Sequence, residues 1–315
     1  MTILIVGAAG NLGSHLTKHL LGGPHSLRLL THTSALPVEV ANDPRISKIN
    51  ADLNDPLSLV NACSSVDCVV YAAGVLFRPR PESFLHITNT KYVQNIVDAA
   101  LSTGVRKFVL ISFPHVEGET SPEVPALGQL DAHSTTLHSQ TRLAAEQYLF
   151  RACEGKAMKP LVLRAGVVYG RDVKLIEAAR SLMRMRLFAI WRTPTWVHLL
   201  ALPDFLRIVE IGIEKTDLCG IFNVCDDKPM LLQDFLDEIA AHWGFKAPLR
   251  LPAFVFYWTA ILCETFATIF HTNTPLTRDI VTMGMTSVVA DTSRMKNEIS
   301  ATLLFPTLKQ GLSII

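Results

Sequence analysis

The sequence has almost no excess of charge of either sign. Its 315 residues include 29 lysines and arginines and 28 aspartates and glutamates, which gives a formal net charge of +1. A nucleic-acid-binding chain usually carries a basic surplus, so we predict no nucleic-acid partner. The chain also has no internal repeat and no low-complexity run, which excludes a repeat architecture.

Cysteine is present, but not in the spacings that bind metal or form a redox pair. The six cysteines form no CxxC pair and no zinc-ligand set with nearby histidines. This favours reduced thiols in a cytoplasmic protein, and we predict no metal site. We expect no signal peptide either, because strand-like sequence begins at Ile3 and runs directly into a glycine loop.

Hydrophobic residues make up 49% of the chain, enough for a large core, and they occur in alternating strand-like and helix-like segments. Near-continuous apolar runs at 68–74, 107–112 and 160–166 are typical of strands buried on both faces. Segments with helical spacing, such as 12–21 and 90–102, separate these runs. The alternation predicts an α/β fold with a Rossmann-like, doubly wound parallel sheet.

After about residue 170 this alternation becomes looser. We therefore predict a dinucleotide-binding Rossmann domain over residues 1–170, with segments around 195–225 returning to it. Residues 171–315 are expected to form mainly a smaller C-terminal substrate lobe. The substrate would then lie between the two parts, outside the carboxyl ends of the strands.

The longest apolar run, LPAFVFYWTAILCETFATIF, occupies residues 251–270. It approaches the length needed to span a bilayer, but Glu264 interrupts it and Pro252 lies near its start. Two interpretations are open. One is a buried or interfacial helix, and the other is a helix that makes peripheral contact with a membrane or lies on a greasy substrate.

The sharpest motif is the turn from Gly7 to Gly13, which follows an apolar strand and opens a helix. Glycines here permit a tight turn, a close approach of the backbone to a ligand, and close packing of the helix on the strand. The free N–H groups of the helix start then face the ligand. We predict that the turn holds the pyrophosphate of NAD(H) or NADP(H). The residues assigned to this contact are Gly7, Ala9, Gly10, Asn11, Leu12 and Gly13.

The spacing GxxGxxG resembles that of the short-chain dehydrogenase/reductase superfamily, and further motifs resemble its extended branch, the NAD-dependent epimerase/dehydratase family. Residues 164–170 (RAGVVYG) are similar to the RPxxVYG turn of that family, with Ala165 in place of proline. Residues 198–204 and 222–224 resemble two later landmarks. Beyond the glycine turn, the resemblance implies cofactor contacts from Asp52, Leu53, Ala72, Ala73, Gly74, Asn89, Ala165, Val167 and Val168.

Within that branch, the last third of the chain loosely resembles the 3β-hydroxysteroid and sterol dehydrogenase group. The similarity rests on the apolar run, on residues 274–278 (TPLTR), and on Asp291 and Thr292. It implies an apolar alcohol or ketone as the small-molecule substrate, in preference to a sugar nucleotide. The superfamily resemblance also implies a homodimer that pairs through helices beside the site.

The choice between NAD and NADP depends on the end of the second strand. An acidic residue there would bind the adenosine 2′-hydroxyl and favour NAD. This sequence has Thr31 and His32 at that point and no carboxylate. With Arg28 nearby, these residues tolerate a 2′-phosphate, so NADP is favoured over NAD. The alternative is that His32 is an ordinary exposed loop residue.

The catalytic positions depart from the family pattern. The resemblance places the Tyr-xxx-Lys pair of that family, which moves a proton at the substrate oxygen and grips the ribose, at His138 and Arg142. The serine position falls on Phe113, with Ser112 one residue earlier. Arg142 keeps a permanent charge that can hold a cofactor hydroxyl or phosphate. His138 can serve as an acid or base near neutral pH.

Two functions are compatible with this altered triad. The leading hypothesis is an NAD(P)-dependent oxidoreductase or epimerase in which His138, Arg142 and Ser112 are catalytic. The rival is a non-catalytic NAD(P)-binding protein, either a redox sensor or an assembly subunit that keeps its cofactor as structure. Loss of the tyrosine and lysine favours the rival, whereas the mostly enzymatic character of the family favours the first.

Overall fold

The computed structural model describes residues 1–31, 43–75, 79–274 and 276–315. Its main element is a seven-stranded sheet with the strand order β11-β6-β5-β4-β1-β2-β3, in which all neighbours are parallel. The strands are β1 (Thr2–Val6), β2 (Ser26–Thr31), β3 (Ile46–Asn50), β4 (Cys68–Tyr71), β5 (Lys107–Ser112), β6 (Lys159–Ala165) and β11 (Gly220–Val224). The predicted Rossmann-like sheet is confirmed.

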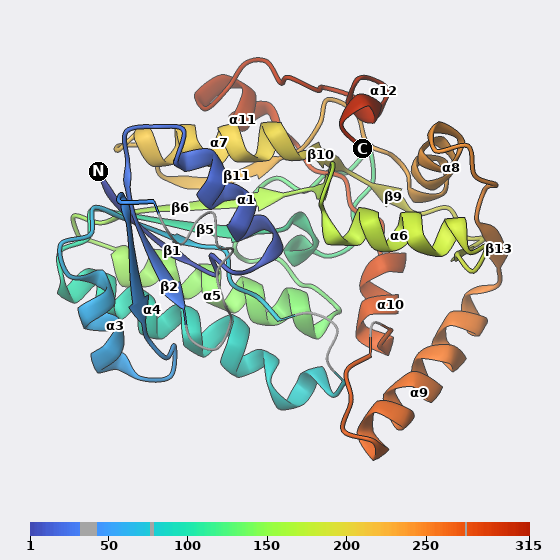
Figure 1. Ribbon diagram of the computed structural model, residues 1–315, viewed down its shortest axis with the longest axis horizontal. Coiled ribbons are helices and arrows are strands. Elements are labelled where there is room, and N and C mark those ends of the chain that lie inside the picture. Colours follow the sequence, from blue (N-terminus) through green and yellow to red (C-terminus); the bar gives the residue numbers. More distant parts are fainter. Residues whose placement is uncertain (32–42, 76–78, 275) are drawn as a thin grey trace.

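Helices cover both faces of this sheet (Figure 1). Helices α3 (Pro56–Cys63), α4 (Tyr92–Ser102) and α5 (Leu137–Cys153) pack side by side on one face. Helices α1 (Asn11–Leu20) and α7 (Leu202–Glu214) pack together on the other. Because both faces are covered, β1 and β4 are almost entirely buried, which explains their continuous apolar sequences.

The strand order reverses between β1 and β4. From β1 the chain continues to β2 and β3 on one side, whereas β4, β5 and β6 follow on the other side. In open α/β sheets, ligands bind outside the carboxyl ends of the two strands at such a reversal. In this protein those ends lead into the turn after Val6 and into residues 72–75.

Residues after 170 add one strand to the main sheet and several short pairs beside it. The paired strands are β7 (Val167–Tyr169) with β10 (Leu199–Ala201), β9 (Trp196–Val197) with β12 (Met230–Leu231), and β8 (Ala189–Trp191) with β13 (Leu249–Leu251). The helices described here are α6 (Lys174–Arg184), α8 (Leu232–His242), α9 (Ala253–Ile269), α10 (Arg278–Met285), α11 (Ser293–Glu298) and α12 (Leu308–Gly311). The shorter turns are η1 (Pro81–Ser83), η2 (His86–Lys91, a π-helix), η3 (Pro114–Glu117) and η4 (Leu312–Ile314). The division of the chain at residue 170 stays a prediction.

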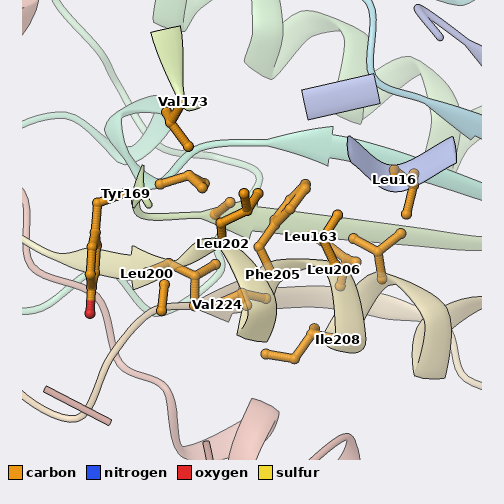
Figure 2. Close-up of a cluster of buried hydrophobic side chains, with 14 of the residues drawn as sticks. Leu16, Leu163, Tyr169, Val173, Leu200, Leu202, Phe205, Leu206, Ile208 and Val224 are labelled. Carbon is orange, nitrogen blue, oxygen red and sulfur yellow. The ribbon is translucent and has the colours of Figure 1, made fainter. Parts of the chain in front are cut away.

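Helix α7 forms much of the core on its face of the sheet. Figure 2 shows Phe205 and Leu206 of α7 gathered with Leu163 of β6 and Leu16 of α1. Gly212 permits this close approach, because a β-carbon there would lie 3.0 Å from the Leu161 side chain. Apolar packing across three elements therefore holds the segment that returns to the sheet.

Helix α9 is exposed rather than buried. Of its residues, all of which the structure describes, Ala260 and Ala267 alone are buried. It lies at the rim of the molecule, away from the main sheet (Figure 1). Of the interpretation of residues 251–270 as a buried or interfacial helix, the buried form is therefore wrong, and the interfacial form stays a prediction. In the described parts of the chain, no helix reaches the length and apolarity that a bilayer crossing requires.

Asp226, which follows β11, is a buried carboxyl group with long hydrogen bonds. The N–H of Ala201 and the hydroxyl of Tyr169 donate to it, each at 3.3 Å. Burial raises the pKa of Asp226 to about 7, the charges of Asp204 and Asp227 add to this, and the hydrogen bonds offset only part of it. The folded state therefore retains a proton on Asp226 at pH values where the unfolded chain has lost it.

This difference predicts a stability contribution that falls as pH rises. Between about pH 4, the ordinary aspartate pKa, and about pH 7, the folded state binds more protons than the unfolded state. The contribution of Asp226 to the free energy of unfolding should thus be complete below pH 4 and be lost by about pH 7, at up to ~1.4 kcal/mol per pH unit.

Urea unfolding of Asp226→Asn from pH 4 to 8 measures this contribution. An uncharged amide of the same shape removes the pH dependence, so the stability of the variant relative to wild type should rise between pH 4 and 7. Asp131→Asn, at an exposed aspartate that does not act on Asp226, is the control. If the difference in unfolding free energy between Asp226→Asn and wild type stayed the same from pH 4 to 8, Asp226 would not titrate as described.

Candidate functional site

The turn after β1 leaves no room for side chains. Gly7 has a φ of +94°, and a β-carbon there would lie 2.7 Å from the backbone nitrogen of Ala73. A β-carbon on Gly13 would lie 2.1 Å from the carbonyl oxygen of Gly7, and one on Gly10 would lie 3.0 Å from the same oxygen. The N–H of Gly10 donates to that oxygen at 2.9 Å and closes the turn. A ligand at the strand end therefore meets bare backbone.

Helix α1 begins directly behind this turn. Its N-cap residue Gly10 has no side chain to cap the helix, and the first turn contains no acidic residue. The first N–H groups of any helix lack carbonyl partners within the helix, and the helix dipole places partial positive charge there. A pyrophosphate fits this combination of free donors and positive potential.

Asn11 fastens this helix start to the segment before α6. Its Nδ2 donates to the carbonyl oxygen of Asp172 at 2.8 Å, and its Oδ1 accepts from the N–H of Lys174 at 2.8 Å. The side chain of Asn11 is thus engaged with protein, which leaves its backbone for the ligand contact that the sequence predicts. Its neighbours Ala9 and Leu12 are half-buried.

Three predicted cofactor contacts lie directly after β4. Ala72, Ala73 and Gly74 continue the strand, and the N–H of Ala72 donates to the carbonyl oxygen of Val6 at 2.9 Å. This bond holds the segment beside the glycine turn. Substrate and cofactor roles for these residues stay predictions.

The remaining predicted cofactor contacts in the described chain lie at or just after strands, except for Asn89. Asp52 and Leu53 follow β3, where the Asp52 carboxylate accepts from the N–H of Asn54 at 2.9 Å. Thr31 ends β2, Ala165 ends β6, and Val167 and Val168 belong to β7. His32 lies outside the described residues. Asn89 is buried in η2 and donates to the hydroxyl of Thr141 at 3.1 Å.

His138 and Arg142 lie one turn apart near the start of α5. The helix begins at Leu137, where the side chain of Thr136 caps it by accepting from the N–H of Ser139. Both side chains are buried and both contact the segment after β4. Arg142 Nη2 donates to the carbonyl oxygen of Ala73 at 3.3 Å, and His138 Nε2 lies 3.2 Å from the carbonyl oxygen of Val75. The predicted pair therefore meets the strand end beside the glycine turn.

Arg142 carries buried donors that the protein does not use. Its Nε and Nη1 have no hydrogen-bond partner among the described residues, and burial lowers the pKa of its guanidinium. A buried charged group with unpaired N–H donors is costly unless something else accepts from them. Hydroxyl and phosphate oxygens are suitable acceptors, so Arg142 and the glycine turn together fit a nicotinamide dinucleotide.

Asp279, the first-turn acid of α10, holds His138. Its Oδ2 lies 2.8 Å from His138 Nδ1, and its Oδ1 accepts from the N–H of Leu137 at 3.0 Å. Burial acts to raise the pKa of Asp279, but the hydrogen bonds and charge of His138 outweigh it and the pKa is lowered. The sequence analysis missed Asp279, although it directly follows residues 274–278, which carry part of the steroid dehydrogenase resemblance.

Ser112, at the end of β5, belongs to a buried polar network. Its hydroxyl donates to Glu146 of α5, and Arg164 of β6 pairs with Glu146 and with Glu117. Arg164 and Glu146 are fully buried. The hydroxyl proton of Ser112 is therefore held by a carboxylate, and its catalytic role stays a prediction. The three charged residues of this network were not identified from the sequence.

A cavity of about 600 Å³ adjoins Asp279, between η1, the start of α5, α9 and α10. Its lining includes Arg80, Glu82, Glu264 and Arg278, and the last two form an ion pair at 2.8 Å. Charged and threonine side chains share this lining with Pro81, Leu137 and Ile269, so the cavity offers both polar and apolar surface.

Comparison with known proteins places these features in a wider group. Residues 3–191 match the NAD dependent epimerase/dehydratase family. A 3 beta-hydroxysteroid dehydrogenase type 7 from Rattus norvegicus is 27% identical over 277 residues, which cover 83% of this chain and 76% of that protein. A 2-alkyl-3-oxoalkanoate reductase from Stenotrophomonas maltophilia is 22% identical over 256 residues, which cover 78% of this chain and 76% of that protein.

Solved structures show the same fold. The dTDP-glucose 4,6-dehydratase from Streptomyces venezuelae with NAD and TYD bound gives a TM-score of 0.80 at 14% identity. The match covers 100% of this chain and 95% of that chain. The UDP-glucuronic acid 4-epimerase from Bacillus cereus in complex with NAD gives a TM-score of 0.76 at 18% identity, with 100% and 97% covered. At such identities the similarity concerns the fold alone.

Gly13→Ala tests the turn as the cofactor site. The added β-carbon cannot fit 2.1 Å from the Gly7 oxygen, so the turn must open and misplace the helix start. We expect at least about 100-fold weaker binding of NADH and NADPH by isothermal titration calorimetry, comparable to the loss of two or more hydrogen bonds to a charged group.

Gly155→Ala is the control: Gly155 has a φ of +67°, which strains any other residue, but nothing lies within 4 Å of an added β-carbon. It should lose some stability and keep its cofactor affinity. Equal affinity of Gly13→Ala and wild type would place the cofactor elsewhere.

Proposed function

Because this chain belongs to the NAD dependent epimerase/dehydratase family, we propose that it is an NAD(P)-dependent oxidoreductase or epimerase that acts on an apolar alcohol or ketone. The relatives that the chain matches include a 2-alkyl-3-oxoalkanoate reductase, an NAD-dependent glucose-6-phosphate dehydrogenase and a UDP-glucose 4-epimerase. The observation that carries the proposal is the buried pair of His138 and Arg142, which contacts the strand end beside the glycine turn. A bound nicotinamide would accept or supply the hydride.

Arg142 is proposed to hold the cofactor. Its Nη2 is anchored on the Ala73 carbonyl at 3.3 Å, while its Nε and Nη1 are buried donors without a partner in the described chain. A guanidinium cannot serve as a proton carrier, because it stays charged at any physiological pH. Its work is therefore to bind and orient ribose or phosphate oxygens.

His138 is proposed as the proton donor or acceptor at the substrate oxygen. Each ring nitrogen faces an oxygen: Asp279 at 2.8 Å from Nδ1 and the Val75 carbonyl at 3.2 Å from Nε2. A protonated ring satisfies both contacts, whereas a neutral ring satisfies one. The carboxylate of Asp279 orients the ring, and exchange of the longer Val75 contact for a substrate oxygen would allow Nε2 to pass its proton on.

One specific observation supports the rival, a non-catalytic NAD(P)-binding protein. Both ring nitrogens of His138 and the hydroxyl of Ser112 already have partners within the protein. A site whose candidate proton-transfer groups are already satisfied by the protein can hold a cofactor as structure or as a redox signal. Turnover separates the two proposals, since both require cofactor binding.

The proposed preference for NADP over NAD now depends on fewer residues. Arg28 donates to the carbonyl oxygens of Ala62 and Ser64, at 3.0 and 2.6 Å, and so points to the end of α3. It does not support a 2′-phosphate. The proposal rests on Thr31 at the end of β2, where a carboxylate would favour NAD. Several solved structures of this fold hold NAD, so both cofactors belong in the assay.

Substitution of His138 tests catalysis. In assays of ketones and alcohols with NADH and NADPH, His138→Gln should lower kcat/KM by about 10²- to 10⁴-fold and leave cofactor affinity within a few-fold of wild type. Asp279→Asn should lower kcat less and alter the pH profile, because it acts by positioning the ring.

His133→Gln, at an exposed histidine five residues before His138, serves as the control. Equal turnover of His138→Gln and wild type would remove His138 from the mechanism. Cofactor binding without turnover of any substrate class would favour the non-catalytic alternative.

We propose that the outer face of α9 makes a peripheral contact with an anionic membrane surface. Phe254, Trp258, Leu262 and Phe266 follow one another at four-residue intervals, and each is 57–69% exposed. Such spacing puts them on one side of the helix. Exposed aromatic and aliphatic side chains in one stripe are typical of helices that lie in a lipid interface.

Positive charge lies at the N-terminal end of this stripe. Strand β13, which leads into α9, pairs with β8, and the exposed residues on and around these strands include Arg184, Arg186, Arg192 and Lys246. Leu187 and Leu249, on or beside the same strands, are also exposed and add apolar surface there. An apolar stripe with a basic end matches anionic headgroups over acyl chains.

Co-sedimentation with vesicles tests this contact. The double variant Trp258→Asp/Leu262→Asp should bind vesicles of phosphatidylcholine with 30% phosphatidylserine at least about 100-fold more weakly than wild type, since each buried anchor contributes roughly 1.5–3 kcal/mol. Leu57→Asp, at an 81% exposed residue of α3, should bind as wild type does. A wild-type dimer in sedimentation velocity that the double variant abolishes, without lipid binding, would instead make α9 a homodimer interface.

A further inference from the structure

Two histidines and two glutamates meet at the edge of the sheet opposite the glycine turn. His19 lies in the last turn of α1, His25 directly precedes β2, and Glu210 and Glu214 lie one turn apart at the end of α7. Helices α1 and α7 both run from the carboxyl edge of the sheet to its amino edge and pack against each other. Their C-terminal ends therefore meet here, far from the nicotinamide site.

His25 is the unusual member of this cluster. It is 4% exposed, and neither ring nitrogen has a hydrogen-bond partner in the part of the chain that the structure describes. Its Nε2 lies 3.5 Å from Glu214 Oε1, which is long for a hydrogen bond. A buried imidazole without partners costs free energy unless a ligand engages it.

The surrounding atoms form a donor set for a divalent metal ion. One nitrogen of His25 and one carboxylate oxygen each of Glu210 and Glu214 all lie within 4.8 Å of one another. Zinc bonds of roughly 2.0–2.2 Å in a tetrahedron place neighbouring ligand atoms about 3.3 Å apart. The distance of 3.5 Å between His25 and Glu214 already approaches this value.

His19 supports one of these carboxylates from outside. Its Nε2 lies 2.8 Å from Glu210 Oε2, while Oε1 of the same residue lies on the side of Gly23 and His25. Metal-bound carboxylates commonly have such an outer hydrogen bond, which orients them toward the metal. The C-terminal ends of α1 and α7 add partial negative charge, which favours a cation at this point.

We propose that His25, Glu210 and Glu214 bind Zn²⁺ at the amino edge of the sheet, with His19 as a positioning residue for Glu210. Imidazole with carboxylates is a donor set that suits zinc and related divalent transition metals. The ion would join the end of α1 to the end of α7 and leave one coordination position for water. It would stabilise the fold and take no part in hydride transfer.

Titration of the chelator-treated protein with ZnCl₂ tests the site. Isothermal titration calorimetry should give one bound ion per chain, Co²⁺ should develop the visible absorption of a tetrahedral site, and Tm should rise with Zn²⁺. His25→Gln and Glu214→Gln should each weaken binding at least about 100-fold. His19→Gln should weaken it by roughly 10- to 100-fold.

His242→Gln, at an exposed histidine at the end of α8, is the matched control and should bind as wild type does. Glu214 is half exposed, so its variant keeps the test valid if His25→Gln fails to fold. Zinc binding that survives in Glu214→Gln, or no saturable binding by wild type, would overturn the proposal. Cofactor binding is measured separately on the same samples, so its failure is distinguishable from failure of this site.

Discussion

The site depends on close contacts of the backbone at Gly7 with the backbone of two other segments. These contacts are so close that a β-carbon on Gly7 or Gly13 would not fit. The start of α1 packs on the carbonyl of Gly7, and Gly7 packs on the backbone of Ala73. These contacts fix the uncapped helix end beside the end of β4. Attraction of a pyrophosphate to that helix end is a local effect that falls off within the first turn, so it is useful only because the turn stays this narrow.

The segment after β4 also positions the two candidate catalytic side chains. Arg142 and His138 both contact carbonyl oxygens of residues 73–75, and Asp279 of α10 fixes the His138 ring from the other side. The histidine is thereby held between the segment after β4 and the last third of the chain. The orientation of a group on α5 thus depends on a segment more than a hundred residues away.

Two buried arginines show how differently the protein treats positive charge. Arg164 is surrounded by acceptors from Glu146, Glu117 and the carbonyl of Gln129, as a structural buried charge must be. Arg142 has one backbone acceptor and two donors to spare among the described residues. Because both arginines are buried, we attribute the two spare donors of Arg142 to a ligand that accepts from them. Arg164 needs no such ligand.

Short-range patterns in the sequence were sufficient for the sheet, its helices and the glycine turn, because strand burial and backbone freedom act over a few residues. The family resemblance, rather than these patterns, placed His138 and Arg142 one turn apart on a helix. Exposure of α9 was not predictable, since an apolar run reads alike whether it faces a core or a surface. The partnership of His138 with Asp279, the network around Arg164, and the meeting of His25 with Glu210 and Glu214 join residues far apart in the chain. Only the packing of the helices and strands decides which of these distant side chains come within reach of one another.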